Sequence, residues 1–154
     1  SDTHDRLDRT ARAVALLARN GAAALVHCGD FTSAPCLVAC HGMPTYFVFG
    51  NNDDPPELER AAAETGAICL GWGGDIELAG KRVAVTHGHM TSDVRRLMAA
   101  GPDYLLSGHS HSRDDSRTGS TRRVNPGALH RAAEYTVALI DLAADEVRFL
   151  NVPV

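Results

Sequence analysis

Two histidines separated by one residue follow a short apolar run in the second half of the chain. The segment Gly108-His109-Ser110-His111 comes directly after residues 103–107, which predict a buried strand. Alternate residues of an extended segment face the same way, so His109 and His111 can point at one place. Two neutral imidazoles in this arrangement suit a divalent transition metal, and we predict that both are metal ligands.

Two oxygen-bearing side chains follow earlier apolar runs in the same way. Residues 23–26 and 45–49 predict buried strands, and they lead into Asp30 and Asn51, respectively. As metal ligands, Asp30 would supply a carboxylate that bridges two ions, and Asn51 a neutral amide oxygen. The alternative is local structure: Asp30 would be a turn residue or a helix cap, and Asn51 part of a turn.

Three further candidates complete the set. The predicted strand over residues 81–86 ends in His87-Gly88-His89, and we favour His87 as the ligand because it lies nearest the strand end. Asp2 and His4 are spaced like a metal pair, but no predicted strand precedes them. We therefore expect an apolar strand of about five or six residues upstream of Ser1, since this is a common strand length.

Strands and helices alternate along what we predict to be a single domain of residues 1–154. Helical spacing of apolar residues and capping signals predict four helices, and two late apolar runs predict a β-hairpin. The alternation predicts an α/β fold, with the candidate ligands at the carboxyl ends of its strands. The predicted helices cover residues 7–18, 34–39, 55–65 and 92–100, with Ser92 as the cap of the last, and the hairpin strands cover 135–141 and 146–152.

A polar, arginine-rich segment over residues 113–123 has no helical period, and we favour a solvated loop there. Contact of its arginines with a phosphorylated substrate is the alternative. Residues 125–127, Asn-Pro-Gly, predict a turn.

The composition excludes several classes of protein. The 154 residues carry a formal net charge of −4 and no apolar stretch long enough to span a membrane. The acidic balance and low aromatic content argue against nucleic acid as a partner. Four cysteines without a leader sequence predict reduced thiols and a cytoplasmic protein. The apolar residues are accounted for by the predicted elements, which leaves a homo-oligomer open.

The candidate ligands together predict a centre with two metal ions. Seven ligands are too many for one four-coordinate ion, but they suit two divalent ions that share a carboxylate. Such a pair acidifies a bridging water to a hydroxide nucleophile and attracts phosphate. In-line hydrolysis of a small phosphoester is therefore the predicted reaction. The seven ligands are Asp2, His4, Asp30, Asn51, His87, His109 and His111.

Five motifs in order resemble those of the calcineurin-like metallophosphoesterase superfamily, in particular its small bacterial and archaeal phosphodiesterase branch. They are Asp-x-His, Gly-Asp, Gly-Asn-x-Asp, His-Gly-His and Gly-His-x-His, and with the later Asn-Pro-Gly they span residues 1–127.

This resemblance implies a sandwich of two β-sheets flanked by helices, and a division of the ligands between two ions. Manganese is the expected metal, with nickel, iron or zinc as alternatives. One ion would be held by Asp2, His4, Asp30 and His111, and the other by Asp30, Asn51, His87 and His109.

The chain departs from the family pattern at two positions besides its beginning. Ser33 stands where many relatives have Asp, and Asn52 stands where the larger phosphatases have a histidine that is thought to protonate the leaving group. Because an amide is no general acid near neutral pH, we predict a preference for esters with good leaving groups, or a proton donor elsewhere. His89 is the candidate donor, and we assign Asp30, Asn51 and His89 to catalysis.

Two other functions compete with a phosphoesterase. A non-catalytic scaffold, resembling the small subunit of the retromer coat, would share the fold with a degraded metal site. A nuclease would resemble relatives that carry extra domains. We favour the phosphoesterase because all seven ligand positions hold metal-binding residue types and the chain predicts one domain.

Overall fold

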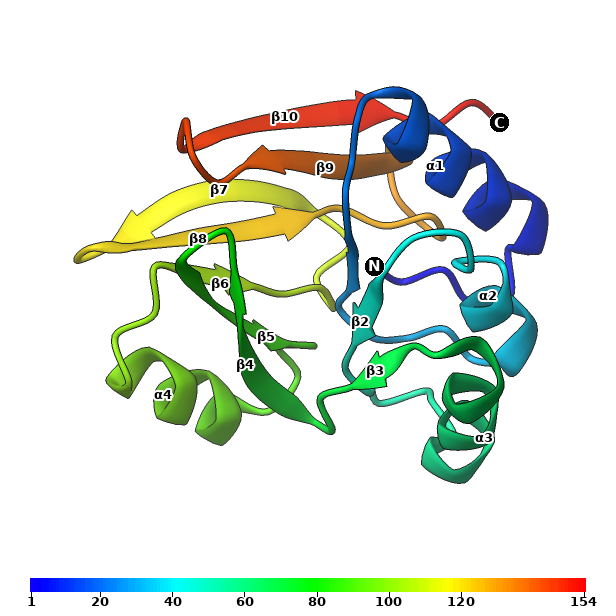
Figure 1. Cartoon of the computed structure of the whole chain (residues 1–154), viewed down its shortest axis with the longest axis horizontal. Helices are drawn as coiled ribbons and strands as arrows, with labels where there is room; N and C mark the ends of the chain where they lie inside the picture. Colours follow the sequence, from blue (N-terminus) through cyan, green and yellow to red (C-terminus); the bar gives the residue numbers. More distant parts are fainter.

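The computed structural model describes residues 1–154, and its elements form an α/β sandwich (Figure 1). The largest sheet has five strands in the order β4-β5-β6-β8-β7. Its inner strands β5, β6 and β8 are parallel, and β4 and β7 pair antiparallel at the two edges. The strands are β4 (Gly73–Leu78), β5 (Lys81–Thr86), β6 (Tyr104–Leu106), β7 (Arg113–Thr118) and β8 (Thr121–Pro126).

Two smaller sheets pack on one face of this large sheet. A parallel sheet has the order β1-β2-β3, and an antiparallel pair is formed by β9 and β10. Val26 of β1 and Ala138 of β9 both pack against the cluster formed by Val83, Tyr104 and other residues of the large sheet. The strands are β1 (Leu25–His27), β2 (Thr45–Phe47), β3 (Ile68–Cys69), β9 (Thr136–Asp141) and β10 (Glu146–Asn151).

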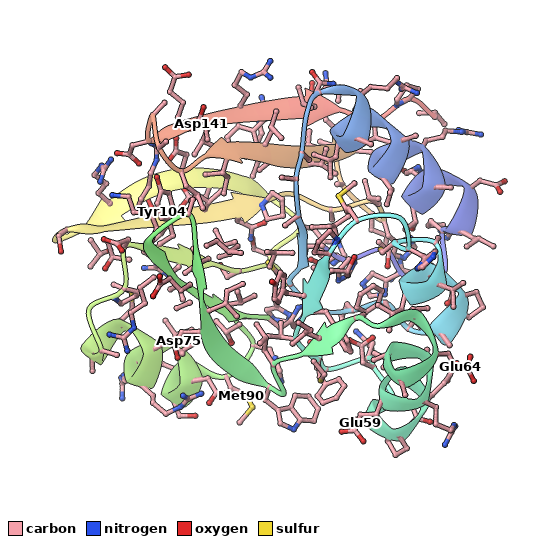
Figure 2. All side chains as sticks on the ribbon, in the orientation of Figure 1. Glu59, Glu64, Asp75, Met90, Tyr104 and Asp141 are labelled. Atoms are coloured by element: carbon pink, nitrogen blue, oxygen red, sulfur yellow. The ribbon has the colours of Figure 1, made fainter.

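Helices cover the outer faces of both layers. On the outer face of the large sheet, Leu97 of α4 packs against Ala84 and Leu105, which alternate with residues that face the smaller sheets. On α3, Leu58 is buried, whereas Glu59 and Glu64 lie on the exposed face (Figure 2). The helices are α1 (Leu7–Arg19), α2 (Ala34–Val38), α3 (Pro55–Thr65) and α4 (Thr91–Ala99).

The predicted α/β class and the helix-flanked sandwich are confirmed, and so is the hairpin, formed by β9 and β10. The four predicted helices are present, and their bounds differ from the predicted ones by no more than one residue at either end. The prediction of Ser92 as a helix cap was wrong. Met90 occupies the N-cap position of α4 without a side-chain hydrogen bond, and Ser92 lies within the helix.

The prediction of a solvated loop over residues 113–123 was also wrong. β7 and β8 form an antiparallel hairpin there, joined by a tight turn, and β8 extends through Asn125 and Pro126, where the sequence predicts a turn. Every residue of β7 is exposed, because the strand lies at the edge of the sheet, and charged residues are common on such edges. The strand is therefore polar throughout, and no apolar run marks it in the sequence.

Arg117 and Arg122 of this hairpin are paired with acids. Arg122 contacts Asp115 at 2.8 Å and Asp145 at 3.0 Å, and Arg117 also pairs with Asp145.

No helix in the structure combines the length and the apolar character needed to cross a bilayer.

Candidate metal centre

Asp30 lies between two histidines that come from distant parts of the chain. Its Oδ2 atom is 3.4 Å from Nε2 of His4 and 3.4 Å from Nε2 of His87. Asp30 follows the end of β1 and His87 follows the end of β5, so one residue from each layer of the sandwich meets here. A carboxylate between two imidazoles has the arrangement expected of a ligand shared by two metal ions.

Asp2 is the second carboxylate of the same cluster. Its Oδ1 atom is 3.2 Å from Nε2 of His111 and 4.0 Å from Nε2 of both His4 and His87. Its Oδ2 atom accepts the backbone amide hydrogen of His109 at 3.1 Å. Asp2 therefore has one oxygen bound to the backbone and the other aimed at three imidazoles, and it is fully buried.

Three atoms of this cluster are buried without any hydrogen-bond partner: Asp2 Oδ1, His4 Nε2 and His87 Nε2. Buried polar atoms in native proteins are rarely unpaired, because loss of water is costly unless something replaces it. His87 donates its Nδ1 hydrogen to the carbonyl oxygen of Cys28 at 2.7 Å, which directs the lone pair of Nε2 into the cluster. These atoms fit a divalent cation, which accepts oxygen and nitrogen lone pairs together.

The pKa values around Asp30 favour positive charge at the same place. Burial opposes ionisation of Asp30, but the nearby His87 and the hydrogen bonds from Asn52 outweigh it and hold the pKa of this carboxyl well below its usual range. For His87, burial opposes protonation, yet its contacts with Asp30 and the Cys28 carbonyl raise the pKa. A metal ion would supply that positive charge.

The backbone is unusual at five of the seven predicted ligands. Asp2, His4, Asp30, His109 and His111 all have φ between 41° and 70°, a region that residues other than glycine seldom occupy. Strained conformations of this kind persist where the surrounding structure enforces them, and they gather at functional sites. Their concentration here is independent support for a site.

Two glycines allow the carboxylates to approach the backbone closely. A Cβ atom on Gly108 would lie 2.6 Å from Oδ2 of Asp2 and would also overlap Ser1. A Cβ atom on Gly50 would overlap both the backbone nitrogen and the carboxylate of Asp30. Each glycine therefore leaves the space that one buried carboxylate occupies.

Not all predicted site residues come together. The ligand atoms of Asp2, His4 and His111 form one possible metal-binding group, and those of Asp2, Asp30 and His87 form another. The ring of His109 lies 5.1 Å from that of His87 between centroids, outside both groups. The side chain of Asn51 is exposed and makes no hydrogen bond, so its role as a ligand stays a prediction.

His89, the predicted proton donor, lies beside the cluster. Its ring centroid is 5.3 Å from that of His87 and 6.1 Å from that of His109. Burial, together with the neighbouring histidines, lowers the pKa of His89, and its Nδ1 atom is buried without a partner.

Several contacts that sequence reasoning missed hold the ligands in place. Asn52 donates its backbone and side-chain N–H groups to Asp30 at 2.9 and 2.8 Å. The ring of His130 lies 4.8 Å from that of His4 between centroids, and Asn125 donates to the carbonyl oxygen of Gly108 at 2.9 Å. No local spacing could have indicated these contacts, because each joins segments that are far apart in the sequence.

Comparisons with known proteins give the family and the fold of this chain. A family model described as the calcineurin-like phosphoesterase superfamily domain matches residues 1–145. Phosphodiesterase MJ0936 of Methanocaldococcus jannaschii is 25% identical over 165 residues, which cover 96% of this chain and 93% of that protein.

Solved structures show the same fold. An archaeal phosphodiesterase superposes with a TM-score of 0.89 and 23% identity, over 98% of this chain and 96% of that one. The phosphoesterase Yfce from E. coli superposes with a TM-score of 0.69 and 20% identity, over 99% of this chain and 96% of that one. Since the family model covers most of the sequence, the chain belongs to the calcineurin-like phosphoesterase superfamily.

Proposed function

We propose that this protein is a phosphodiesterase that depends on two divalent metal ions. The observation that carries the proposal is the position of Asp30 Oδ2, 3.4 Å from Nε2 of both His4 and His87. These two nitrogen atoms and Asp2 Oδ1 are buried without a hydrogen-bond partner. One shared carboxylate between two sets of histidines is the donor arrangement of a two-metal site. The name of the M. jannaschii relative supports a diester as the substrate class.

The ligands divide into two groups around Asp30. Asp2, His4, Asp30 and His111 would hold one ion, and Asp30, Asn51, His87 and His109 the other. When bound, two such ions acidify a shared water for in-line attack on phosphorus and neutralise the phosphate oxygens. Histidine and carboxylate donors suit manganese, iron, nickel and zinc, and manganese is the metal to be tested first.

The residues of the chain supply position and proton transfer. Asn52 holds both oxygens of Asp30 and so fixes the direction of the shared carboxylate. Because Asn52 cannot donate a proton to a leaving group near neutral pH, His89 is proposed as the donor, and esters with acidic leaving groups would react fastest. The substrate is a small phosphoester.

The test is hydrolysis of bis-p-nitrophenyl phosphate by metal-stripped protein, with and without added Mn²⁺. Wild-type protein is expected to gain activity with manganese and to bind two ions per chain. His87→Ala is expected to lose at least about 100-fold in activity, as expected when a nucleophile-activating group is lost. His41→Ala is the matched control, because His41 is exposed and makes no side-chain hydrogen bond.

Protein that holds two ions per chain and hydrolyses neither bis-p-nitrophenyl phosphate nor p-nitrophenyl phosphate would contradict the proposal. That result would favour the non-catalytic scaffold. Hydrolysis of the monoester alone would keep the metal centre but replace the diester by a monoester.

A further inference from the structure

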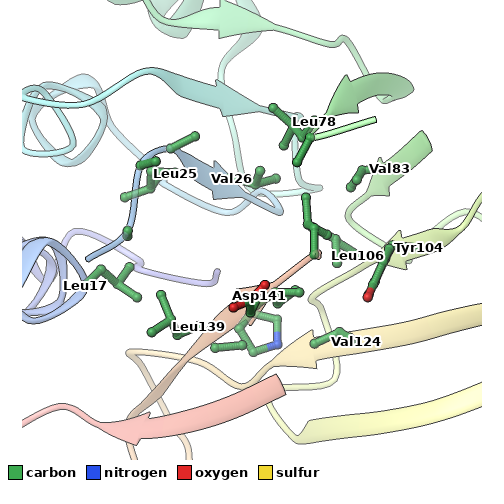
Figure 3. A pocket seen from close by; sticks show the side chains of 18 of the residues that line it. Leu17, Leu25, Val26, Leu78, Val83, Tyr104, Leu106, Val124, Leu139 and Asp141 are labelled. Atoms are coloured by element: carbon green, nitrogen blue, oxygen red, sulfur yellow. The ribbon is translucent and has the colours of Figure 1, made fainter. Parts of the chain in front are cut away.

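The largest cavity of the structure lies outside the metal centre. It has a volume of about 670 Å³, and none of its lining residues is a predicted metal ligand. Figure 3 shows that apolar side chains such as Leu25, Val83 and Leu139 surround it. The cavity therefore offers no contacts to a substrate whose phosphate lies at the metal centre, and the side chains beside the centre have that role.

Trp72, the only tryptophan of the chain, is exposed beside the metal centre. The residue is 43% exposed, although tryptophan is on average highly buried in folded proteins. Its ring centroid lies 5.9 Å from that of His89. The His89 ring in turn lies 5.3 Å from the ring of His87 and 6.1 Å from that of His109. Only one imidazole ring thus separates the indole from two predicted metal ligands.

The core behind the indole holds it in place. Phe49 is buried, and its ring lies 5.4 Å from that of Trp72 between centroids. The backbone amide of Phe49 donates to the carbonyl oxygen of Gly71 at 2.9 Å, and the Thr86 hydroxyl donates to the carbonyl oxygen of Trp72 at 3.4 Å. The ring is therefore anchored before any ligand binds, which lowers the entropy cost of binding.

No aromatic ring stacks on the indole. The rings of Phe49 and His89 are tilted by 63° and 61° from the plane of Trp72, which is an edge-to-face arrangement. Met90, next to His89 in the chain, is also exposed and adds apolar surface in this region (Figure 2). An anchored, exposed ring without a stacked neighbour can accept another flat ring by stacking.

We propose that Trp72 stacks on the base of a nucleotide diester whose phosphate is bound at the metal centre. This inference rests on the proposed phosphodiesterase function and names its substrate class. Every base has a flat π-face that stacks on aromatic side chains, and the two fused rings of an indole match those of a purine. In a nucleotide one pentose separates the base from the phosphate, and here one imidazole ring separates the indole from His87. A single exposed indole serves one base, which agrees with a small diester as the substrate.

The experiment titrates Mn²⁺-loaded protein with adenosine monophosphate and with ribose phosphate, which lacks the base. Because Trp72 is the only tryptophan, tryptophan fluorescence reports on this one side chain. Adenosine monophosphate is expected to quench the fluorescence, and ribose phosphate is expected to leave it nearly unchanged. Calorimetry is expected to show that the nucleotide binds at least about fivefold more tightly, which is the lower end of what stacking on an aromatic side chain contributes.

Variants of Trp72 assign the preference to its ring. Trp72→Leu is expected to bind the two ligands equally, and Trp72→Phe, which keeps a flat ring, is expected to retain most of the preference. Ile68→Ala is the matched control and should keep the full preference, because Ile68 is an exposed apolar residue on the edge strand β3. Thermal unfolding of each variant checks that the fold is kept. Equal affinities of the two ligands for wild-type protein, or an unchanged preference in Trp72→Leu, would overturn the proposal.

These binding measurements are independent of hydrolysis. Activity on bis-p-nitrophenyl phosphate without any preference for the nucleotide would keep the proposed function and overturn the role of Trp72. A preference for the nucleotide that is lost in Trp72→Leu, in protein that hydrolyses no ester, would support the stacking site and contradict the phosphodiesterase function.

Discussion

The carboxylate of Asp53 accepts the backbone amide hydrogen of Asp30 at 2.9 Å. The same carboxylate accepts the amide hydrogens of Gly50 at 2.7 Å and Thr32 at 2.8 Å. Asp53 thus ties the loop after β1 to the loop after β2, and it holds Asp30 in its left-handed conformation, with φ at 61°. It is a positioning residue, because its contacts reach the metal centre only through the backbone of Asp30.

Asp53→Asn is expected to weaken metal binding by about 10- to 100-fold, the usual cost of losing a group that orients a ligand. The side-chain amide of asparagine has one acceptor oxygen. Its NH₂ group would replace the second carboxylate oxygen and would face a backbone N–H group, which is also a donor. The unfolding free energy should fall by about 1–3 kcal/mol for the amide left unpaired. Metal affinity by calorimetry and urea unfolding measure the two effects. Asp54→Asn is the control, since Asp54 caps α3 without a side-chain hydrogen bond. Equal effects of the two variants would remove Asp53 from this role.

Gly50→Ala is expected to reduce metal content and manganese-dependent hydrolysis by at least about tenfold. The added methyl group would overlap the Asp30 carboxylate, so the shared ligand must move. Gly80→Ala serves as the control, because a Cβ atom at Gly80 meets nothing within 4 Å although φ is +72°. That variant should lose stability of about 1 kcal/mol and retain the metal. Metal analysis with parallel thermal unfolding separates the two outcomes, and full metal content in Gly50→Ala would contradict the expectation.

Asn52→His is expected to improve hydrolysis of diesters with poor leaving groups. An imidazole beside Asp30 can donate a proton to the leaving oxygen, and general acid catalysis contributes on the order of 10²-fold or more. The measurement is the ratio of kcat/KM for a phenyl ester to that for a p-nitrophenyl ester. Asn52→Gln is the control, since it keeps an amide and adds no acid. An unchanged ratio in Asn52→His would count against the idea that the protein lacks a general acid at position 52.

His89→Gln tests the proposed proton donor in the wild-type background. We expect kcat to fall by on the order of 10²-fold for a phenyl ester and to change little for a p-nitrophenyl ester, whose leaving group needs no proton. Metal content is measured in the same samples, because the ring of His89 lies 5.3 Å from that of His87. Equal losses on both esters would mean that His89 does not act on the leaving group.

In the folded protein, Tyr104 should lose its proton at a higher pH than an ordinary tyrosine. Burial, together with the acceptor Asp145, raises the pKa of Tyr104 to about 12 from its ordinary value of 10. The neutral phenol is favoured in the folded state, so its contribution to stability is full below pH 10 and is lost as the pH rises towards 12. The difference in absorbance at 295 nm between wild type and Tyr104→Phe should show this transition. A difference curve centred at pH 10 would contradict the expectation.

Much of the fold could be predicted from local patterns. Apolar residues recur at helical spacing in α1, and α3 begins at Asp54-Pro55 and ends at Gly66 in the left-handed conformation. β9 and β10 are two apolar runs joined by a short turn. These signals lie within one segment and need no partner. β7 escaped prediction because an exposed edge strand has no apolar face.

The site also has features that the local sequence predicts and features that depend on the tertiary structure. The sequence by itself determined which residue types follow each strand, since apolar runs and the polar residues after them are local features. These features, together with the Asp-x-His spacing at the start of the chain, predict seven ligands: Asp2, His4, Asp30, Asn51, His87, His109 and His111. Only the tertiary structure decided which atoms meet: that Asp30 lies between His4 and His87, that Asn52 contacts Asp30 while Asn51 does not, and that His130 lies against His4. Such contacts join loops from different strands, and their geometry depends on how the two layers pack.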